Sequence, residues 1–498
     1  MTNQRWWKRF IGVVVPVAIL LATGNQGTAQ EAPNPTVLAQ YVLMAHGDLL
    51  DRTVPLARVI LAQPAASCPE IELSGGNAPL PMSLRSNPNP SAFGVVVCEA
   101  IVLLKEGVIA TVEGQTNPLP VPTEGEISLN QVVVFGDSGC KGGDKQVCQG
   151  SETSPATWPF PQIASAAAET APDLVIHVGD YNYSGTPNKT GAGQWSYDGC
   201  VPADGGPLVH QSTYDTWTTW QADFFKAAEP LLAAAPWVFV RGNHELCSRA
   251  GQGWFYFLDA HSPLLNPYEA QPSCQAATAL TQPYKLSFSN LDLVVLDSAN
   301  ACGGEDPESA AGTAYEVSNF MRQLTTVNAL VNGSQKPAWL VAHRPIWSLY
   351  QDSGSPPSTE NTTLQAALAA TPAKGLAAPI KMVLSGHMHQ FFSLTFQEGN
   401  RPPQLVIGDS GVALSSNSLP SSFSQAVDGI PASGLSLNGP LDYGYLAVEM
   451  KNGGQWKGTV KAFSASGEAQ VTPLAVCGLP TENGRLCQEG MASAQKPN

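Results

Sequence analysis

Short, nearly continuous runs of apolar residues recur along the middle of the chain, and each run stops at a glycine or a polar residue. Such runs are typical of strands that are covered on both faces of a sheet. The runs predict strands at 131–135, 174–178, 237–240, 338–341 and 381–384. Segments with helical spacing or many alanines lie between them, at 161–170, 214–235 and 317–331. This alternation predicts a layered α/β domain with helices covering the sheets.

Other apolar runs extend this pattern toward both ends of the chain. A hairpin is predicted at 285–288 and 291–296, and further strands at 390–396, 404–407, 444–450 and 458–465. Upstream, short apolar runs between proline and glycine clusters predict a small all-β domain, with a helix at 37–50 as an alternative. We therefore expect a β-sandwich-like domain over 30–126, the α/β domain over 127–475 and a C-terminal tail over 476–498.

The first 29 residues have the pattern of a signal peptide. Arg5, Lys8 and Arg9 precede an apolar segment at 11–22, and small residues at 27–29 offer a cleavage site. An uncleaved anchor is the alternative. We expect an exported protein, periplasmic or secreted, that has no membrane association after cleavage.

The ten cysteines are an even number, as expected for disulfides in an exported chain. Their spacing leaves the connectivity open. The expected pairs are Cys140–Cys148, Cys477–Cys487, Cys68–Cys98, Cys200–Cys247 and Cys274–Cys302.

The net charge of −15 argues against a protein that binds nucleic acid through a basic face. Any site for an anionic substrate must therefore obtain its positive potential locally, for example from metal ions.

Five of the predicted strands end in side chains that commonly bind metals. They are Asp137, Asp180 with Tyr183, Asn243 with His244, His343, and His387 with His389. The carboxyl ends of strands are where open α/β sheets place their sites. Oxygen and imidazole ligands without thiolates suit iron, manganese or zinc, and a carboxylate can bridge two ions. Two ions roughly 3.5–4 Å apart can bind both oxygens of a phosphoryl transfer.

The order Gly-Asp, Gly-Asp, Gly-Asn-His-Glu, His, Gly-His-x-His resembles the calcineurin-like metallophosphoesterases, over about 132–411. This resemblance implies a four-layer α/β sandwich as the catalytic domain. The common pattern has a histidine two residues after the first aspartate, where this chain has Gly139. Instead, Tyr183 follows Asp180 by three residues, which resembles the purple acid phosphatase branch, where a tyrosinate binds a ferric ion. A phenol with a pKa near 10 needs a strong Lewis acid as partner. The alternative is that Tyr183 only packs beside the site.

The resemblance implies a role for each ligand residue. The first ion, iron, would be held by Asp137, Asp180, Tyr183 and His389. Asp180 would bridge to a second ion of zinc, manganese or iron, held also by Asn243, His343 and His387. His244 would be the general acid, and a metal-bound hydroxide would attack a phosphate monoester. The partner expected is thus a small phosphorylated substrate, with no nucleic acid beyond nucleotides.

Several other side chains have weaker claims. We expect Arg241 and Arg344 to form scaffold salt bridges, with contact to phosphate as the alternative. We expect Glu245 to orient its neighbours and His177 to be a core residue. His210 and His261 are candidates for the pocket lining, and Trp195, Tyr197 and Trp217 for a substrate wall or ordinary packing.

Three other functions stay open. The first is a phosphodiesterase acting on nucleotide or lipid headgroup esters. The second is a serine hydrolase, because Gly-Asp-Ser-Gly occurs at 136–139 and 408–411, although no partner histidine motif precedes either copy. The third is a non-catalytic binding protein, although all ligand positions are filled. The natural substrate and the oligomeric state are not predicted.

Overall fold

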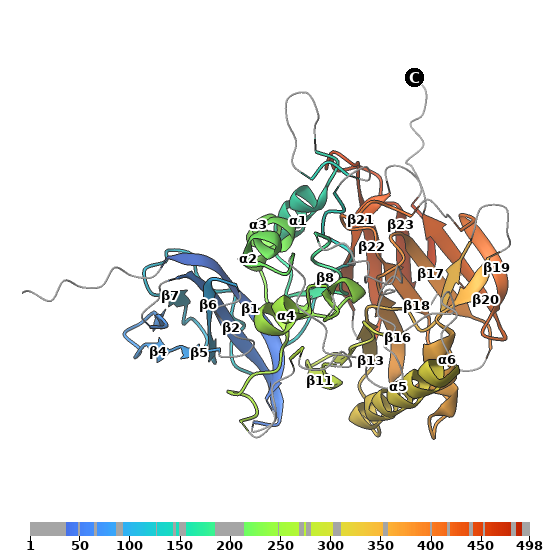
Figure 1. Cartoon of the computed structure of the whole chain (residues 1–498), viewed down its shortest axis with the longest axis horizontal. Helices are drawn as coiled ribbons and strands as arrows, with labels where there is room; N and C mark the ends of the chain where they lie inside the picture. Colours follow the sequence, from blue (N-terminus) through green and yellow to red (C-terminus); the bar gives the residue numbers. More distant parts are fainter. Residues whose placement is uncertain are drawn as a thin grey trace, which may run out of the picture. The chain divides into compact units, whose positions relative to one another are not determined.

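Two large mixed β-sheets make up most of the regular structure in the described residues (Figure 1). The computed structural model describes residues 36–47, 50–63, 67–85, 93–125, 127–142, 146–148, 156–184, 214–247, 249–267, 273–274, 280–301, 310–351, 357–398, 401–415, 419–437, 442–451, 454–479 and 485–490. The predicted signal peptide lies outside these ranges.

The first sheet has eleven strands among the described residues. In spatial order they are β24 (Cys487–Glu489), β23 (Ala475–Leu479), β22 (Trp456–Phe463), β21 (Tyr443–Met450), β8 (Gln131–Phe135), β9 (Leu174–His177), β10 (Trp237–Phe239), β1 (Val37–Gly47), β2 (Arg52–Ala62), β6 (Val95–Ile101) and β5 (Ser83–Leu84). Its central strands β8, β9 and β10 run parallel, so their carboxyl ends lie at one edge.

The second sheet has eight strands among the described residues. They are, in order, β11 (Tyr284–Ser287), β12 (Asp292–Leu296), β13 (Ala338–Ala342), β16 (Ile380–Ser385), β18 (Gln404–Ile407), β17 (Phe391–Phe396), β20 (Ile430–Leu437) and β19 (Ser422–Val427). Strands β12, β13, β16 and β18 are parallel. Two small sheets pair β14 (Ser348–Tyr350) with β15 (Ser358–Glu360), and β3 (Glu70–Leu73) with β4 (Leu80–Pro81) and β7 (Ala110–Val112).

Few helices accompany the sheets in the described part of the chain. They are α1 (Phe160–Ala168), α2 (Trp217–Trp220), η2 (Gln221–Phe225), α3 (Lys226–Leu232), η3 (Asn243–Glu245), α4 (Gly251–Gly253), η4 (Trp254–Leu258), α5 (Ala310–Val331) and α6 (Thr362–Ala370). Helix α1 packs on α3, and α5 packs on β12 and α6. Within the described ranges, no helix has the length and apolar character needed to cross a membrane.

The apolar faces of the two sheets pack into one core. Val133 on β8 and Trp237 on β10 belong to the same buried cluster as Val341 on β13 and Leu384 on β16. This packing brings the carboxyl ends of strands from both sheets together, which prepares a shared site.

The N-terminal strands continue the first sheet. Strand β1 pairs with β2 along its whole length, and its Leu43 pairs with Trp237 on β10. The helix considered for 37–50 is therefore wrong, because sheet pairing outweighs local helix preference. A strand-rich N-terminal region and mixed sheets with few helices are confirmed. The boundary at 126/127 and the four-layer arrangement stay predictions.

Four disulfides join described cysteines. Cys68–Cys98, Cys140–Cys148 and Cys477–Cys487 are as predicted. Cys247 pairs with Cys274 instead, so the predicted pairs Cys200–Cys247 and Cys274–Cys302 are wrong. The turn into α4 is compatible with this pairing because residue 251 is glycine: a Cβ there would lie 2.8 Å from both the Cys274 sulfur and the Leu246 carbonyl carbon. Cys200 and Cys302 lie outside the described residues. Four disulfides are consistent with an oxidising, exported environment.

Candidate metal centre

Each predicted ligand lies on the loop that leaves the carboxyl end of a buried strand. Asp137 follows β8, Asp180 follows β9, and Asn243 follows β10 in the first sheet. In the second sheet, His343 follows β13, and His387 with His389 follows β16. The structure brings all of these residues together, as the strand-end argument predicts.

Four of these ligand candidates have a left-handed backbone. The φ angles are 56° at Asp137, 64° at Asp180, 76° at His387 and 51° at His389. This conformation is uncommon for residues other than glycine, and strained positions of this kind cluster at functional sites. The sharp turns aim side chains from successive loop residues at one point.

The first group of ligand atoms surrounds the phenolic oxygen of Tyr183. One ligand atom each from Asp137, Asp180 and His389 lie within 4.8 Å of one another. The Tyr183 Oη is 3.1 Å from Asp137 Oδ1, 2.9 Å from Asp180 Oδ2 and 3.1 Å from His389 Nε2. A phenol has one proton and can donate it to only one of these carboxylates. A cation here would satisfy all four groups, so the residues fit a metal ion.

The second group draws on the other oxygen of Asp180. Ligand atoms of Asp180, His343 and His387 lie within 4.8 Å of one another. His343 Nε2 is 3.3 Å from Asp180 Oδ1 and 2.9 Å from Asn243 Oδ1. Its Nδ1 donates to the carbonyl of Val178 at 2.8 Å, which directs Nε2 into the site. His343 Nε2 faces the oxygens of Asp180 and Asn243. Either a proton on this nitrogen or a cation among the three groups must therefore lie there.

Asp180 therefore belongs to both groups, with one carboxylate oxygen toward each. That is the arrangement a bridging ligand requires. Ligand atoms that bind one ion at about 2.0–2.2 Å are at most about 4.4 Å apart, so the observed spacing needs only small adjustment on binding.

The charges of the centre make a cation favourable. Asp137 and Asp180 are 0% and 1% exposed. Burial raises the pKa of Asp137 well above its usual value, and the charge of Asp180 adds to this shift. Burial also raises the pKa of Tyr183, and both carboxylates reinforce the effect. Two buried carboxylates beside a phenol are costly without positive charge, which one or two metal ions would supply.

In the protein without a metal ion, protonated His343 supplies part of this positive charge. Burial by itself would lower the pKa of His343, but the charge of Asp180 outweighs it and raises that pKa to about 9. The same partner, His343, holds the pKa of Asp180 well below its usual value despite burial. A metal ion would take the place of that proton.

His244 lies beside the ligands without joining either group. Its backbone N–H donates to Asp180 Oδ1 at 2.9 Å, and its ring packs on Tyr183 with centroids 3.8 Å apart. Its Nδ1 is buried and has no hydrogen-bond partner among the described residues. Burial above all lowers its pKa, and Arg249 adds to the shift. The lowered pKa favours the neutral imidazole in the protein alone, so the role of proton donor stays a prediction.

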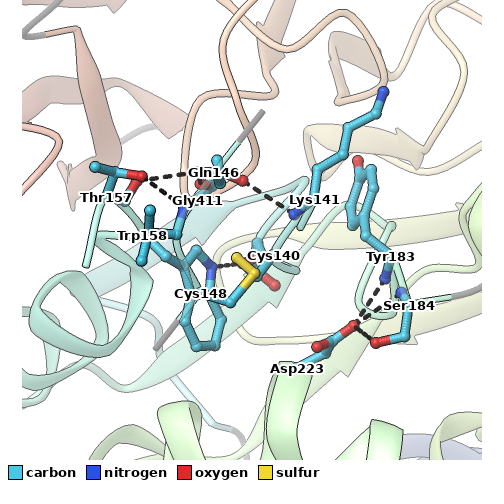
Figure 2. The surroundings of a disulfide bond; sticks show 12 residues. Cys140, Lys141, Gln146, Cys148, Thr157, Trp158, Tyr183, Ser184, Asp223 and Gly411 are labelled. Atoms are coloured by element: carbon cyan, nitrogen blue, oxygen red, sulfur yellow. Dashed lines mark hydrogen bonds between the residues drawn. A yellow bond between two sulfur atoms is a disulfide. The ribbon is translucent and has the colours of Figure 1, made fainter. Parts of the chain in front are cut away.

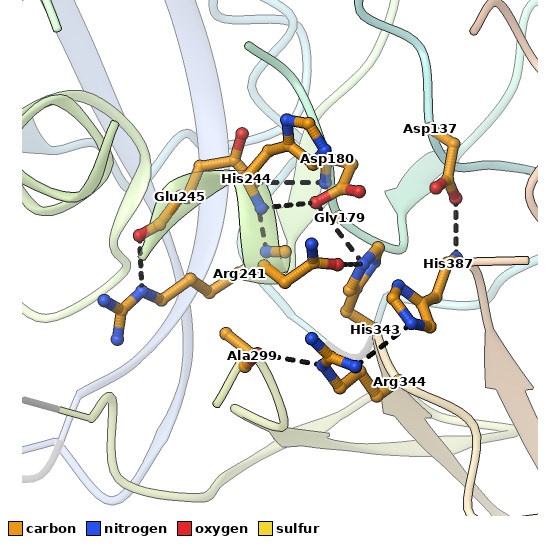
Figure 3. A network of polar contacts seen from close by, with 12 residues as sticks. Asp137, Gly179, Asp180, Arg241, His244, Glu245, Ala299, His343, Arg344 and His387 are labelled. Carbon is orange, nitrogen blue, oxygen red and sulfur yellow. Dashed lines mark hydrogen bonds and ion pairs between the residues drawn. The ribbon is translucent and has the colours of Figure 1, made fainter. Parts of the chain in front are cut away.

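Glu245 and two arginines support these loops (Figure 3). The Glu245 carboxylate accepts backbone N–H groups from Asp180, Tyr181 and Asn182 at 2.8–3.1 Å. Glu245 thus orients the Asp180 loop, as expected. Burial raises its pKa to about 8.

Arg241 pairs with Asp297 at 3.2 Å and donates to the Glu245 carbonyl, so it is a scaffold residue, as predicted. Arg344 differs, because it donates to the Ala299 carbonyl and also contacts His387 Nε2 at 3.1 Å. It therefore touches a ligand candidate directly, and the expected scaffold salt bridge stays a prediction.

Gly139 has no room for a side chain. A Cβ there would lie 2.5 Å from the Tyr181 carbonyl oxygen and 2.6 Å from the Tyr183 ring. Such distances are far below van der Waals contact. The space that a histidine would need is thus filled by the tyrosine loop, which gives a physical reason for the departure from the common pattern.

Both serine motifs are buried, and neither serine contacts an activating base among the described residues. His177 Nδ1 accepts the N–H of Gly179, so its Nε2 carries the proton and donates to Ser138 Oγ at 2.7 Å. An imidazole in that state cannot remove a proton from the serine. Ser410 Oγ accepts the N–H of Gly136. These contacts argue against a serine hydrolase and confirm His177 as a core residue.

The remaining candidates do not reach the centre. His261 pairs with Asp259 at 2.9 Å, and Trp217 packs in the core against Phe225 and Phe257. His210, Trp195 and Tyr197 lie outside the described residues.

One contributor escaped sequence reasoning. Asp223 accepts the N–H groups of Tyr183 and Ser184 and the Ser184 hydroxyl (Figure 2). It lies inside a helical segment and does not follow a strand, so no pattern marked it.

Comparison with known proteins agrees with this geometry. A search of curated proteins finds no match. A scan of protein families matches residues 131–391 to the family described as calcineurin-like phosphoesterase. The matched segment begins at β8 and ends just after His389, and thus spans every ligand candidate. The chain belongs to the calcineurin-like phosphoesterases, a family of hydrolases that cleave phosphoesters with two metal ions.

Proposed function

We propose that this chain is an exported phosphomonoesterase of the purple acid phosphatase type. The observation that supports it best is the contact of the Tyr183 phenolic oxygen with Asp137, Asp180 and His389 at 2.9–3.1 Å. A phenolate beside carboxylates and imidazole suits a ferric ion. We assign iron to this first position and zinc, manganese or iron to the second.

The protein groups would position the reacting atoms. Asp180 would hold both ions, one through each oxygen, while Asn243 and His343 would complete the second position with His387. When bound, the two ions would supply Lewis acidity that polarises the phosphoryl group and acidifies the attacking water. Glu245 would keep Asp180 in place through the backbone of its loop.

His244 would deliver the proton to the leaving alcohol. Its backbone is fixed by Asp180 and its ring by Tyr183, so the imidazole is held in one orientation beside the substrate. A positioned imidazole contributes roughly 10²–10⁴-fold as a general acid. The effect should be largest for esters with poor leaving groups.

Export is supported by the signal-like N-terminal pattern and by disulfides such as Cys140–Cys148. Reducing compartments such as the cytoplasm keep most cysteines as thiols, so a chain with this many disulfides is expected outside the cytoplasm.

The test is hydrolysis of p-nitrophenyl phosphate against its bis ester by the protein with its native metals. We expect two ions per chain, loss of activity on chelation and a higher kcat/KM for the monoester. A higher kcat/KM for the bis ester would favour a phosphodiesterase acting on nucleotide or lipid esters. Full metal content without turnover of either ester would favour a binding protein.

A visible spectrum tests the iron assignment. A ferric ion bound by Tyr183 should give a charge-transfer band that Tyr183→Phe abolishes. Ferric iron in a colourless wild-type protein would contradict phenolate ligation.

A further inference from the structure

The loop at 180–184, which carries two of the ligand candidates, is held from behind by two buried carboxylates. Glu245 accepts the first three backbone N–H groups of the loop. Asp223 accepts the next two, those of Tyr183 and Ser184, each at 3.0 Å. Five successive backbone donors are thus satisfied by two acids from different elements, and neither acid is itself a ligand candidate.

Asp223 reaches the loop from η2, a single turn of π-helix. Such turns are frequent at functional sites. Its carboxyl group is buried, and its Oδ2 accepts the Ser184 hydroxyl at 2.8 Å in addition to the two N–H groups (Figure 2). The next residue, Phe224, packs edge-on against the Tyr181 ring with centroids 5.1 Å apart. Helix η2 is therefore docked on this loop by a polar and an apolar contact.

Tyr183 is fixed at both of its ends. Asp223 holds its backbone N–H, and its phenolic oxygen lies 2.9–3.1 Å from atoms of the first ligand group. The side chain between them is 5% exposed. Removing the Asp223 carboxylate would leave buried donors without this acceptor, which is costly and favours movement of the backbone. Such a movement would carry the phenol away from the first group.

We propose that Asp223 is a positioning residue for the first metal position, because it holds the Tyr183 phenol within the first group of ligand atoms. The proposal rests on the proposed function, which makes Tyr183 a ligand of iron. The support of the loop is thereby divided: Glu245 supports the shared ligand Asp180, and Asp223 supports a ligand of one ion only. Losing Asp223 should therefore weaken binding of the first ion and spare the second.

The test is equilibrium dialysis of the protein against ferric citrate and zinc, with both metals measured by elemental analysis. Asp223→Ala should lower the affinity for iron by roughly 10- to 100-fold, as is typical for partners of metal ligands, and should shift the charge-transfer band. The affinity for zinc should change by less than about threefold. Asp223→Asn keeps an oxygen acceptor and should restore most of the iron affinity.

Asp215→Ala is the matched control. Asp215 is also a buried acid near η2, but it accepts the Trp220 Nε1–H and the N–H of Gly253 rather than those of the ligand loop. Its loss should lower stability in urea and leave the affinities for both metals unchanged. An equal loss of iron affinity in Asp215→Ala and Asp223→Ala would overturn the proposal, because the effect would then be one of general stability.

A double variant separates positioning from a direct effect on the ion. Tyr183→Phe should itself lower the iron affinity, and adding Asp223→Ala should lower it by less than about threefold more, because Asp223 acts through the phenol. Additive losses, or equal weakening of iron and zinc in Asp223→Ala, would overturn the proposal. Unchanged iron affinity in Tyr183→Phe would overturn phenolate ligation and this proposal together. If the wild type bound no iron, the proposed function would fail, and dialysis against zinc alone would still decide whether Asp223→Ala weakens only one of two sites.

Discussion

The two sheets contribute chemically different halves of the candidate metal centre. The oxygen-bearing candidates come from the eleven-stranded sheet, at Asp137, Asp180, Tyr183 and Asn243, and the imidazoles come from the eight-stranded sheet, at His343, His387 and His389. Each group of ligand atoms draws on both sheets. Neither half can therefore bind an ion fully by itself, and the centre forms only when the two sheets are packed.

The halves also differ in charge. The oxygen side has two buried carboxylates, whereas the imidazole side is neutral or positive, and Asp180 alone belongs to both groups. The comparison implies that losing the shared oxygen ligand should harm the site more than losing an imidazole.

The largest effect is expected from Asp180→Ala. The change removes a ligand candidate from each group and leaves His343 without the carboxylate charge that balances it. We expect both ions to be lost and kcat to fall by at least roughly 10³-fold, as measured by elemental analysis and by hydrolysis of p-nitrophenyl phosphate.

His387→Ala is the matched comparison, because His387 belongs to one group only. It should leave about one ion per chain. Asp51→Asn, at an exposed left-handed position, controls for the loss of an acidic residue. Two ions in Asp180→Ala, or none in His387→Ala, would contradict the division into a shared and an unshared ligand.

An intermediate effect is expected from Gly139→Ala, which tests the packing of the oxygen side. The new methyl would meet the Tyr181 carbonyl and the Tyr183 ring. Overpacking of this kind typically costs about 1–3 kcal/mol, which urea unfolding would measure, and it should displace Tyr183 and weaken binding of the first ion. The control is Gly142→Ala on the same loop, where a Cβ would lie 3.5 Å from the Cys148 sulfur. Similar stability of the two variants would show that Gly139 is not constrained by the tyrosine.

An effect on stability alone, with both ions retained, is expected at Asp409, where the two sheets meet. Asp409 follows β18, and its carbonyl accepts the N–H of Gly444 on β21. Its carboxyl is fully buried, both oxygens lack a hydrogen-bond partner among the described residues, and burial raises its pKa to about 8.

Because the unfolded carboxyl ionises near pH 4, the folded state binds the extra proton between about pH 4 and 8. Stability of the wild type should thus fall as pH rises through this window, by at most about 1.4 kcal/mol per pH unit. Asp409→Asn should remove this slope in the free energy of unfolding, and Asp51→Asn should not. An unchanged slope in Asp409→Asn would show that the carboxyl is not held neutral.

The sequence predicted the parts of the structure that rest on local pattern. Continuous apolar runs such as that of β8 predicted the strands, and the polar residues that follow these runs predicted the ligand candidates. The pattern could not predict β1, because a strand at the N-terminus depends on its partner β2 rather than on its own spacing. It also could not pair Cys247 with Cys274, since disulfides depend on tertiary proximity.

The same distinction holds within the site. Asp180 and Tyr183 were predicted because they follow a strand and match a known motif. Asp223 acts through contacts with the backbone of Tyr183, which leave no periodic signal. Backbone strain at His387 is likewise visible only in three dimensions.

Anomalous diffraction from crystals of the metal-loaded protein tests the central claim most directly. The account predicts two metal peaks roughly 3.5–4 Å apart, with one oxygen of Asp180 bound to each, oxygen ligands from one sheet and imidazoles from the other. A single peak, or two peaks of which only one contacts Asp180, would contradict it.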